Sequence, residues 1–155
     1  RNYHTSPNYQ RVPHAIFQPK RITHASLKVK DLSSSIRYYR DILGLDPITK
    51  DTGGDFVTLR STVREENITL IKTCSPQDLS LHHIGFEVWD EECLNKSDDM
   101  LSKRQIEPVF KVDNSSRKSV FIKDPDGFLL EFYWDRSGES TCVEYLGRTL
   151  GSVVP

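Results

Sequence analysis

Two histidines and one glutamate have the residue types and the setting of a metal site. His24 and His83 occupy the same position in two similar strands, residues 22–29 and 81–88. Each strand is followed by an aspartate and then by a stretch with helical periodicity, so the chain reads as a duplicated supersecondary unit. Packing of two such units around a two-fold axis would bring the two histidines to facing positions.

Glu131 stands in the middle of the last apolar strand, residues 128–134. A carboxylate among apolar neighbours must be paired, coordinated or neutralised, because bare burial is costly; an edge strand with Glu131 facing solvent is the alternative. Two neutral imidazoles and one carboxylate make a three-point site for a divalent metal, with open positions for substrate or oxygen. This set favours Fe(II), with Mn(II) or another divalent metal as the alternative.

The elements that must position these residues follow from the hydrophobic periodicity. Alternation in the first strand places His24 on the polar face, opposite Leu27. Asp31 is a good N-cap for a helix that ends at Gly44, and a second helix is expected from Asp90 to about residue 104. Each unit reads β-α-β-β-(β), with helices on one face of a mixed or antiparallel sheet. Further strands are predicted at 56–60, 68–72, 107–112 and 119–122.

Composition excludes several classes of protein. Lys and Arg number 21 against 22 Asp and Glu, which gives a formal net charge of −1 and no basic surface for nucleic acid or anionic lipid. No run approaches the length of a membrane span. The three cysteines are far apart and form no disulfide framework, so we expect a reducing, cytoplasmic setting.

The domain organisation is predicted as a single domain between two polar ends. We expect an N-terminal arm or linker at 1–20, a metal-binding domain at 21–135 and a C-terminal tail at 136–155. Within the domain, the two modules cover about 21–74 and 80–135. Because the chain begins at Arg1 rather than Met, we read it as trimmed or as a piece of a longer protein.

Three motifs in order resemble the vicinal oxygen chelate superfamily. They are the opening H-x-x-L-x-V-x-D with Y-Y-R-D-I-L-G-L (His24 to Leu45), H-H-I-G-F-E-V (His82 to Val88) and D-P-D-G-x-x-x-E (Asp124 to Glu131). The resemblance covers roughly 21–134 and implies an α+β fold, in which paired βαβββ modules curl into an incomplete barrel around a metal. It allows a homodimer, since superfamily members often dimerise.

Within the superfamily, the chain most resembles the catalytic domain of type I extradiol ring-cleaving dioxygenases. That resemblance implies His24, His83 and Glu131 as the metal ligands. Glyoxalase I is similar in fold but has a fourth ligand, a glutamate, at a position that falls near Thr69 here. A threonine cannot serve as a carboxylate, which weakens a glyoxalase interpretation.

The usual proton-transfer residues of the extradiol enzymes are missing. Their positions fall near Val112, Phe121 and Ile68, none of which can transfer a proton. His82 is the remaining candidate for an acid–base role, although strand alternation should point its side chain away from the metal. Phe121 and Trp134 are expected to form apolar walls of the substrate pocket, with Thr69 also beside it.

The leading hypothesis is a metal-dependent enzyme that binds vicinal oxygens of a small aromatic or enolisable substrate. Ring-cleaving dioxygenation with O2 is favoured. A non-oxidative isomerase, cyclase or lyase at the same metal is the second hypothesis. The third is a metal-free binding module of the bleomycin-resistance type, which would leave the two histidines and the glutamate hard to explain.

Overall fold

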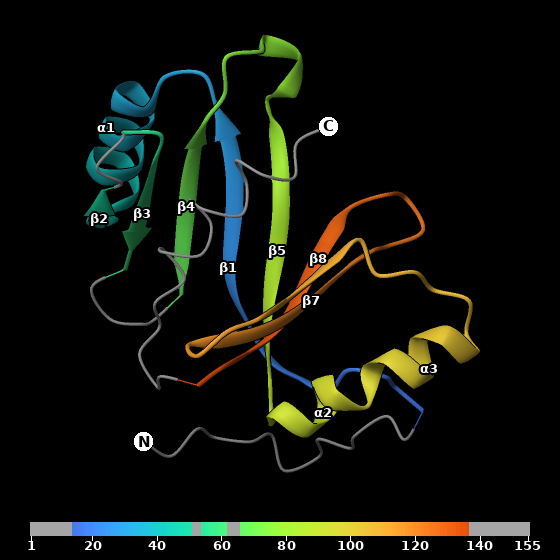
Figure 1. Ribbon diagram of the computed structural model, residues 1–155. Coiled ribbons are helices and arrows are strands. Elements are labelled where there is room, and N and C mark those ends of the chain that lie inside the picture. Colours follow the sequence, from blue (N-terminus) through green and yellow to red (C-terminus); the bar gives the residue numbers. More distant parts are fainter. Residues whose placement is uncertain (1–13, 51–53, 62–65, 137–155) are drawn as a thin grey trace.

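A computed structural model describes residues 14–50, 54–61 and 66–136 (Figure 1). In this part of the chain, eight strands form one mixed sheet in the order β2-β3-β4-β1-β5-β8-β7-β6. A short 3-10 helix, Pro76–Asp78, precedes β5. The strands are β1 (Pro19–Val29), β2 (Asp46–Lys50), β3 (Phe56–Arg60), β4 (Asn67–Lys72), β5 (Ser80–Val88), β6 (Phe110–Asp113), β7 (Arg117–Lys123) and β8 (Leu129–Asp135), and the helices are α1 (Leu32–Leu43), α2 (Glu91–Asn95) and α3 (Ser97–Lys103).

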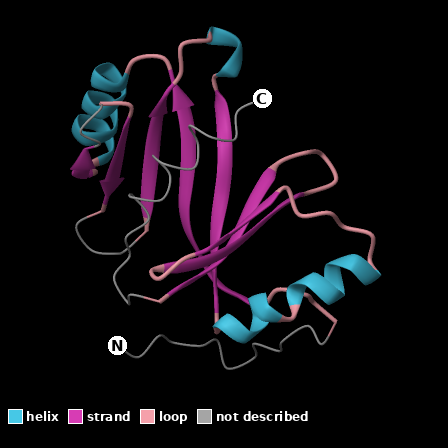
Figure 2. Ribbon diagram, viewed as in Figure 1, coloured by secondary structure: helices cyan, strands magenta, loops and turns pink. Residues whose placement is uncertain are grey.

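The sheet consists of two modules with the same pairing pattern. β1 pairs in parallel with β4, β5 pairs in parallel with β8, and β1 and β5 join the two modules as antiparallel neighbours. The modules are therefore related by an approximate two-fold axis between β1 and β5. The sheet stays open and curved, with the helices at its periphery (Figure 2). The predicted pair of βαβββ modules is confirmed.

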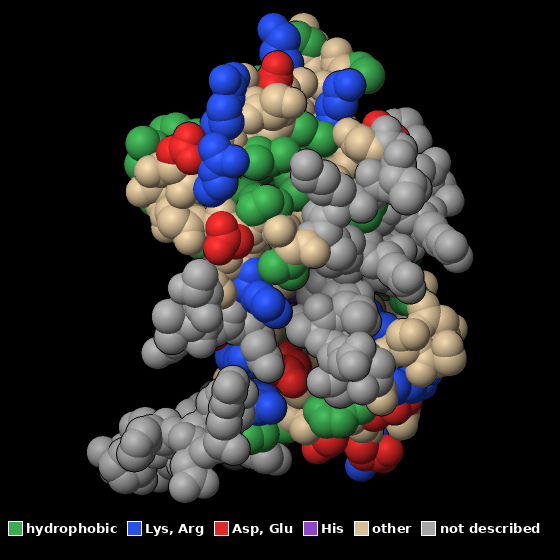
Figure 3. All heavy atoms as spheres, turned by 90° about the vertical axis from the view of Figure 1, so that its left-hand side faces the viewer, with side chains coloured by type: hydrophobic (Ala, Val, Ile, Leu, Met, Phe, Trp, Pro, Cys, Tyr) green, Lys and Arg blue, Asp and Glu red, His purple; other side chains and the backbone are tan. Residues whose placement is uncertain are grey.

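Helix α1 covers the first module and begins and ends as the sequence predicts. The Asp31 side chain accepts a hydrogen bond from the Ser34 backbone N–H (2.8 Å), and Gly44 takes up the left-handed conformation at the C-terminus (φ 69°). Its inner face packs on the core of Val57, Leu59 and Leu70. Its outer side chains stay exposed, among them Tyr38, Ile42 and Leu43. Figure 3 views the molecule from the α1 side and shows hydrophobic side chains gathered between basic ones.

The second module is covered by α2 and α3, which replace the single helix predicted from Asp90 to about residue 104. The helix breaks at Lys96, and the Ser97 hydroxyl donates to the Leu94 carbonyl at 2.7 Å. A serine that bonds back to the preceding turn competes with regular helix hydrogen bonding. Leu94 and Leu101 still face the core, together with Phe132 of β8.

The N-terminal arm and the edges of the sheet differ in part from the predictions. β1 begins at Pro19, and Phe17 stacks on Phe132 with ring centroids 4.0 Å apart, so the end of the predicted arm belongs to the domain. The predicted strand at 107–112 lies at Phe110–Asp113. Strand β2 contains Pro47, and proline is tolerated in a strand at the edge of a sheet. The proline also explains why the sequence pattern did not predict this strand. Residues 1–13 and the predicted tail beyond Arg136 lie outside the described residues.

Candidate metal centre

The structure brings His24, His83 and Glu131 together at the centre of the sheet. Glu131 Oε2 lies 3.0 Å from His24 Nε2 and 3.4 Å from His83 Nε2, and the two Nε2 atoms are 3.1 Å apart. All three side chains are buried, on the neighbouring strands β1, β5 and β8. Glu131 is 1% exposed on a strand between β5 and β7, so the edge-strand alternative is wrong.

Gly85 makes this convergence sterically feasible. In the strand register, Gly85 of β5 stands between His24 of β1 and Glu131 of β8. A Cβ atom on Gly85 would lie 2.0 Å from Cε1 and 2.3 Å from Nε2 of His24. The imidazole therefore lies across the bare backbone of β5, which only glycine allows. Sequence reasoning missed Gly85, although a glycine inside an apolar strand is the usual sign of a close approach.

A β-bulge precedes each histidine. The β1–β5 register slips between Ile22 and His24, where Thr23 is the extra residue, and again opposite Ser26 and Leu27, where His82 is the extra residue. Bulges redirect side chains. Thr23 Oγ1 consequently lies 3.1 Å from His24 Nδ1.

The second bulge corrects the expectation for His82. Its side chain turns toward the site, and its Nδ1 lies 2.7 Å from His83 Nδ1. Burial, reinforced by the nearby His83 and Lys28, lowers the pKa of His82 to about 4. A neutral His82 can accept the proton of His83 Nδ1, which would leave His83 Nε2 unprotonated toward the centre.

The partners of the Thr23 hydroxyl favour one tautomer of His24. The Thr23 hydroxyl can donate only once, and it donates to the Gly85 carbonyl at 3.2 Å. It accepts from the Tyr133 hydroxyl at 2.8 Å, so its contact with His24 Nδ1 is also one in which it accepts. His24 Nδ1 then carries a proton, and Nε2, 3.0 Å from Glu131 Oε2, shares either a second proton or a metal ion with that carboxylate. This outer hydrogen bond is the arrangement found around metal-bound histidines.

The two oxygens of Glu131 have separate partners. Oε1 accepts from the Ser119 hydroxyl at 2.7 Å and lies 3.0 Å from Arg117 Nη2, whereas Oε2 faces the histidines. Arg117 is itself buried and lies over the Tyr133 ring, 3.6 Å from its centroid. Burial alone would raise the pKa of Glu131, but Arg117 and the histidine hydrogen bonds outweigh it and hold the pKa well below its usual value. The carboxylate is therefore charged and presents one oxygen to the centre.

Comparison with known proteins establishes the family. The family described as the Glyoxalase/Bleomycin resistance protein/Dioxygenase superfamily matches residues 21–132. The chain belongs to this superfamily. It is 29% identical over 129 residues to metapyrocatechase from Pseudomonas sp. (strain CF600), covering 81% of this chain but only 39% of that protein.

Two further relatives of the superfamily span different chemistries. The metallothiol transferase FosB of Staphylococcus epidermidis is 29% identical over 122 residues, which cover 72% of this chain and 80% of FosB. The crystal structure of the 2,3-dioxygenase LapB from Pseudomonas sp. KL28 superposes with a TM-score of 0.65 at 23% identity, over 78% of this chain and 42% of LapB. The structural likeness supports the fold, and the sequence relatives are enzymes of the superfamily.

The donor set of this superfamily member fits a divalent metal. The ligand atoms of His24, His83 and Glu131 all lie within 4.8 Å of one another. Both histidines have their Nδ1 atoms engaged on the outside, and a charged carboxylate oxygen faces both Nε2 atoms. Two imidazoles and one carboxylate suit iron, manganese or zinc and leave coordination positions open. Four residues that hold the ligands in place were not predicted from the sequence: Thr23, Arg117, Ser119 and Tyr133. Their only sign in the sequence is a polar residue inside an otherwise apolar strand.

The residues expected to line a substrate pocket separate into two groups. Phe121 is buried beside the triad, its ring centroid 5.6 Å from that of His83 and 4.0 Å from that of Phe110. Thr69 is fully buried in β4. Trp134 instead packs with the core under α2 and α3, because it alternates with Tyr133 on β8 and faces away from the triad. Its predicted role as a pocket wall does not fit this position.

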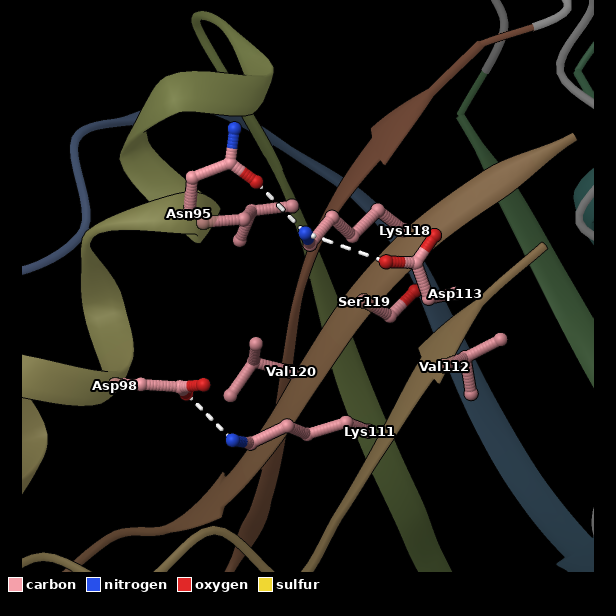
Figure 4. Close-up of a pocket in the computed structure, with 9 residues that line it drawn as sticks. Asn95, Asp98, Lys111, Val112, Asp113, Lys118, Ser119 and Val120 are labelled. Carbon is pink, nitrogen blue, oxygen red and sulfur yellow. Dashed lines mark hydrogen bonds and ion pairs between the residues drawn. The ribbon is translucent and has the colours of Figure 1, made fainter. Parts of the chain in front are cut away.

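Two of the positions predicted to lack a proton-transfer residue, Ile68 and Val112, differ in their surroundings. Ile68 packs against the core beneath α1, away from the triad. Val112 stands opposite Ser119, which bonds Glu131, and it also borders a hollow of about 200 Å³ between the helices and strands β6 and β7 (Figure 4). In that hollow Lys118 bonds Asn95 and Asp113, and Lys111 bonds Asp98, so its charges are already paired.

Among the described residues, no helix has the length and apolar character needed to span a membrane.

Proposed function

We propose that this chain is a metal-dependent enzyme that holds Fe(II) at His24, His83 and Glu131 and binds neighbouring oxygens of a small aromatic or enolisable substrate. The observation that carries this proposal is the convergence of two Nε2 atoms and one charged carboxylate oxygen over Gly85. Extradiol-type ring cleavage with O2 is the reaction we favour. The 29% sequence identity to metapyrocatechase and the fold shared with LapB support this reaction.

The residues of the chain hold the ligands in the state that coordination needs. Thr23 accepts the Nδ1 proton of His24, which directs the Nε2 lone pair inward. Ser119 and Arg117 occupy Glu131 Oε1, which restricts the carboxylate to one inward oxygen. A bound divalent ion would polarise substrate oxygens as a Lewis acid and offer a further position for O2.

Aromatic side chains shape one wall of the site. Phe121 lies edge-on to His83 and stacks on Phe110. An apolar wall excludes water and suits the flat face of an aromatic ring. It offers no proton, so in this reaction the proton of a substrate hydroxyl must leave to another group or to solvent.

A non-oxidative reaction at the same metal is the second candidate. The buried Phe121 favours it, because the tyrosine usual there in extradiol enzymes is absent. The similarity to FosB, named a metallothiol transferase, favours it as well. Isomerisation, cyclisation or a lyase step through an enolate would need the metal but no O2.

Oxygen uptake separates the two candidates. Protein purified anaerobically and reconstituted with Fe(II) is mixed with a panel of catechols in an oxygen electrode, with His83→Ala as the metal-deficient control. Catechol-dependent uptake by the wild type alone supports the dioxygenase. A metal-loaded protein that consumes no oxygen with any catechol overturns that reaction in favour of the non-oxidative one.

A further inference from the structure

The sheet register places two rows of buried residues around the triad. One row runs from Phe121 of β7 through Glu131 and Gly85 to His24. The other runs from Thr58 of β3 through Thr69 of β4 and Ser26 of β1 to His83, and all four of its members are fully buried.

The approximate two-fold axis exchanges these rows. It relates His24 to His83 and Glu131 to Thr69. Glu131 pairs with Gly85, two residues after His83, and Thr69 pairs with Ser26, two residues after His24. Three of the four inward positions therefore carry metal ligands, and the fourth carries a hydroxyl. Thr69 therefore stands where the approximate symmetry would place a fourth ligand.

The hydroxyl row, defined as Ser26, Thr58 and Thr69, has unused hydrogen-bonding capacity. Thr58 Oγ1 and Thr69 Oγ1 lie 3.0 Å apart, so one of their two protons is used between them. Ser26 Oγ is buried and, among the residues that the structure describes, has no hydrogen-bond partner. An unsatisfied buried hydroxyl destabilises a fold, so its presence beside a functional centre calls for an explanation.

We propose that the hydroxyl row is a subsite that donates hydrogen bonds to an oxygen of the ligand bound at the metal centre. Neighbouring strands are about 4.8 Å apart, which places Ser26 one strand from His83 and Thr69 one strand further. A ligand that takes the place of a fourth protein ligand thus meets hydroxyls on the β4 side. This inference rests on the proposed function and adds the specificity of the site.

The two walls together define the chemical class of the ligand. Phe121 and Phe110 present an aromatic surface on one side, and the hydroxyl row presents donors on the other. The fitting ligand is a small compound with an anionic oxygen next to a second oxygen and an apolar or aromatic body. A singly ionised catechol has this form, and so does an enolate with an adjacent oxygen.

The test measures binding of 4-nitrocatechol to Zn(II)-loaded protein, in which no turnover occurs. The variants are Ser26→Ala and Thr69→Val, which remove a hydroxyl with little change in volume. The control is Ser97→Ala, because that buried hydroxyl bonds the Leu94 carbonyl in the helical layer. We expect Ser26→Ala and Thr69→Val each to weaken binding roughly 10- to 100-fold, as for hydrogen bonds to charged groups, with zinc affinity unchanged. Ser97→Ala should bind the probe like the wild type.

Thermal unfolding of the metal-free protein gives a second readout. Ser26→Ala should melt at or above the wild-type temperature because it removes an unsatisfied hydroxyl, whereas Ser97→Ala should melt lower. A lower melting temperature for Ser26→Ala would show a structural role and overturn the inference. Wild-type probe affinity in both zinc-loaded variants would also overturn it and leave the proposed function standing. A wild-type protein that binds no zinc would overturn both.

Discussion

Gly85→Ala should abolish metal binding while the chain still folds. The new Cβ would lie 2.0 Å from His24 Cε1, and ordinary contact begins at 3.4 Å, so the ring must move by about 1.4 Å. Coordination distances tolerate only about 0.2 Å. Loss of an outer hydrogen bond to a ligand already costs 10- to 100-fold in metal affinity, so displacement of the ligand itself should cost more than about 100-fold.

The cost in stability is smaller and can be isolated with a double-mutant cycle. Overpacking of this kind typically costs about 1–3 kcal/mol. His24→Ala removes the ring that the new methyl group meets, so Gly85→Ala should cost little in that background. Urea unfolding of the four metal-free proteins should give a favourable coupling of about 1–3 kcal/mol between the two positions.

Zinc titration with a chromophoric competitor gives the affinity, and circular dichroism gives the fold. The reasoning fails if Gly85→Ala binds zinc as tightly as the wild type. It fails equally if the two stability effects add, because additivity would mean that the ring does not lie across Gly85.

Three further predictions concern the residues that support the ligands. Thr23→Val should weaken zinc binding about 10- to 100-fold, since the first histidine loses its Nδ1 acceptor; unchanged affinity would contradict the tautomer assignment. His82→Leu should weaken zinc binding in the same way, whereas His82→Asn, which keeps an acceptor near His83, should retain it; equal affinities for the two variants would argue against this role. The pKa of Glu131 is depressed in the folded state, so its contribution to stability is present above its unfolded pKa and is lost as pH falls through the folded value. Arg117→Met removes the positive charge that offsets the effect of burial on the pKa of Glu131, whereas Arg117→Lys keeps a positive charge there. In an acid titration followed by circular dichroism, the metal-free Arg117→Met variant should therefore unfold at a higher pH than Arg117→Lys. Coincident midpoints would refute this account.

Periodicity and duplication were sufficient to predict the paired modules and the meeting of His24 with His83. Alternation predicted correctly that Glu131 lies on the opposite face of β8 from Phe132, because the pleat of a strand has a fixed period. The same rule places Trp134 with Phe132 under the helices, so its expected position in the pocket was inconsistent with the strand pattern itself.

Residues that depend on irregular backbone could not be predicted. Strand alternation points His82 away from the site, and only a bulge, which has no sequence signature here, turns it back. Arg117 and Ser119 form the outer support of Glu131 through contacts between β7 and β8 that require the register to be known. The helix break at Lys96 accompanies the hydrogen bond from the Ser97 hydroxyl to the Leu94 carbonyl, and a serine within a helical stretch does not by itself predict such a break.

Variants at the ligands differ in how cleanly they test the centre. Glu131→Ala would leave the Arg117 charge buried without its partner, which typically costs about 3–5 kcal/mol and confuses metal loss with unfolding. Glu131→Gln keeps an oxygen for Ser119 and Arg117 while removing the negative charge. His83→Ala removes a neutral ring and leaves the Glu131 contacts to Arg117 and Ser119 in place.

The most direct test of the central claim is elemental analysis of anaerobically purified wild-type protein beside His83→Ala and Glu131→Gln. The account predicts a stoichiometric divalent metal, with iron favoured, in the wild type, and near-complete loss in both variants with circular dichroism unchanged. A wild-type protein without metal after reconstitution, or variants that retain full metal occupancy, would contradict a metal centre at His24, His83 and Glu131.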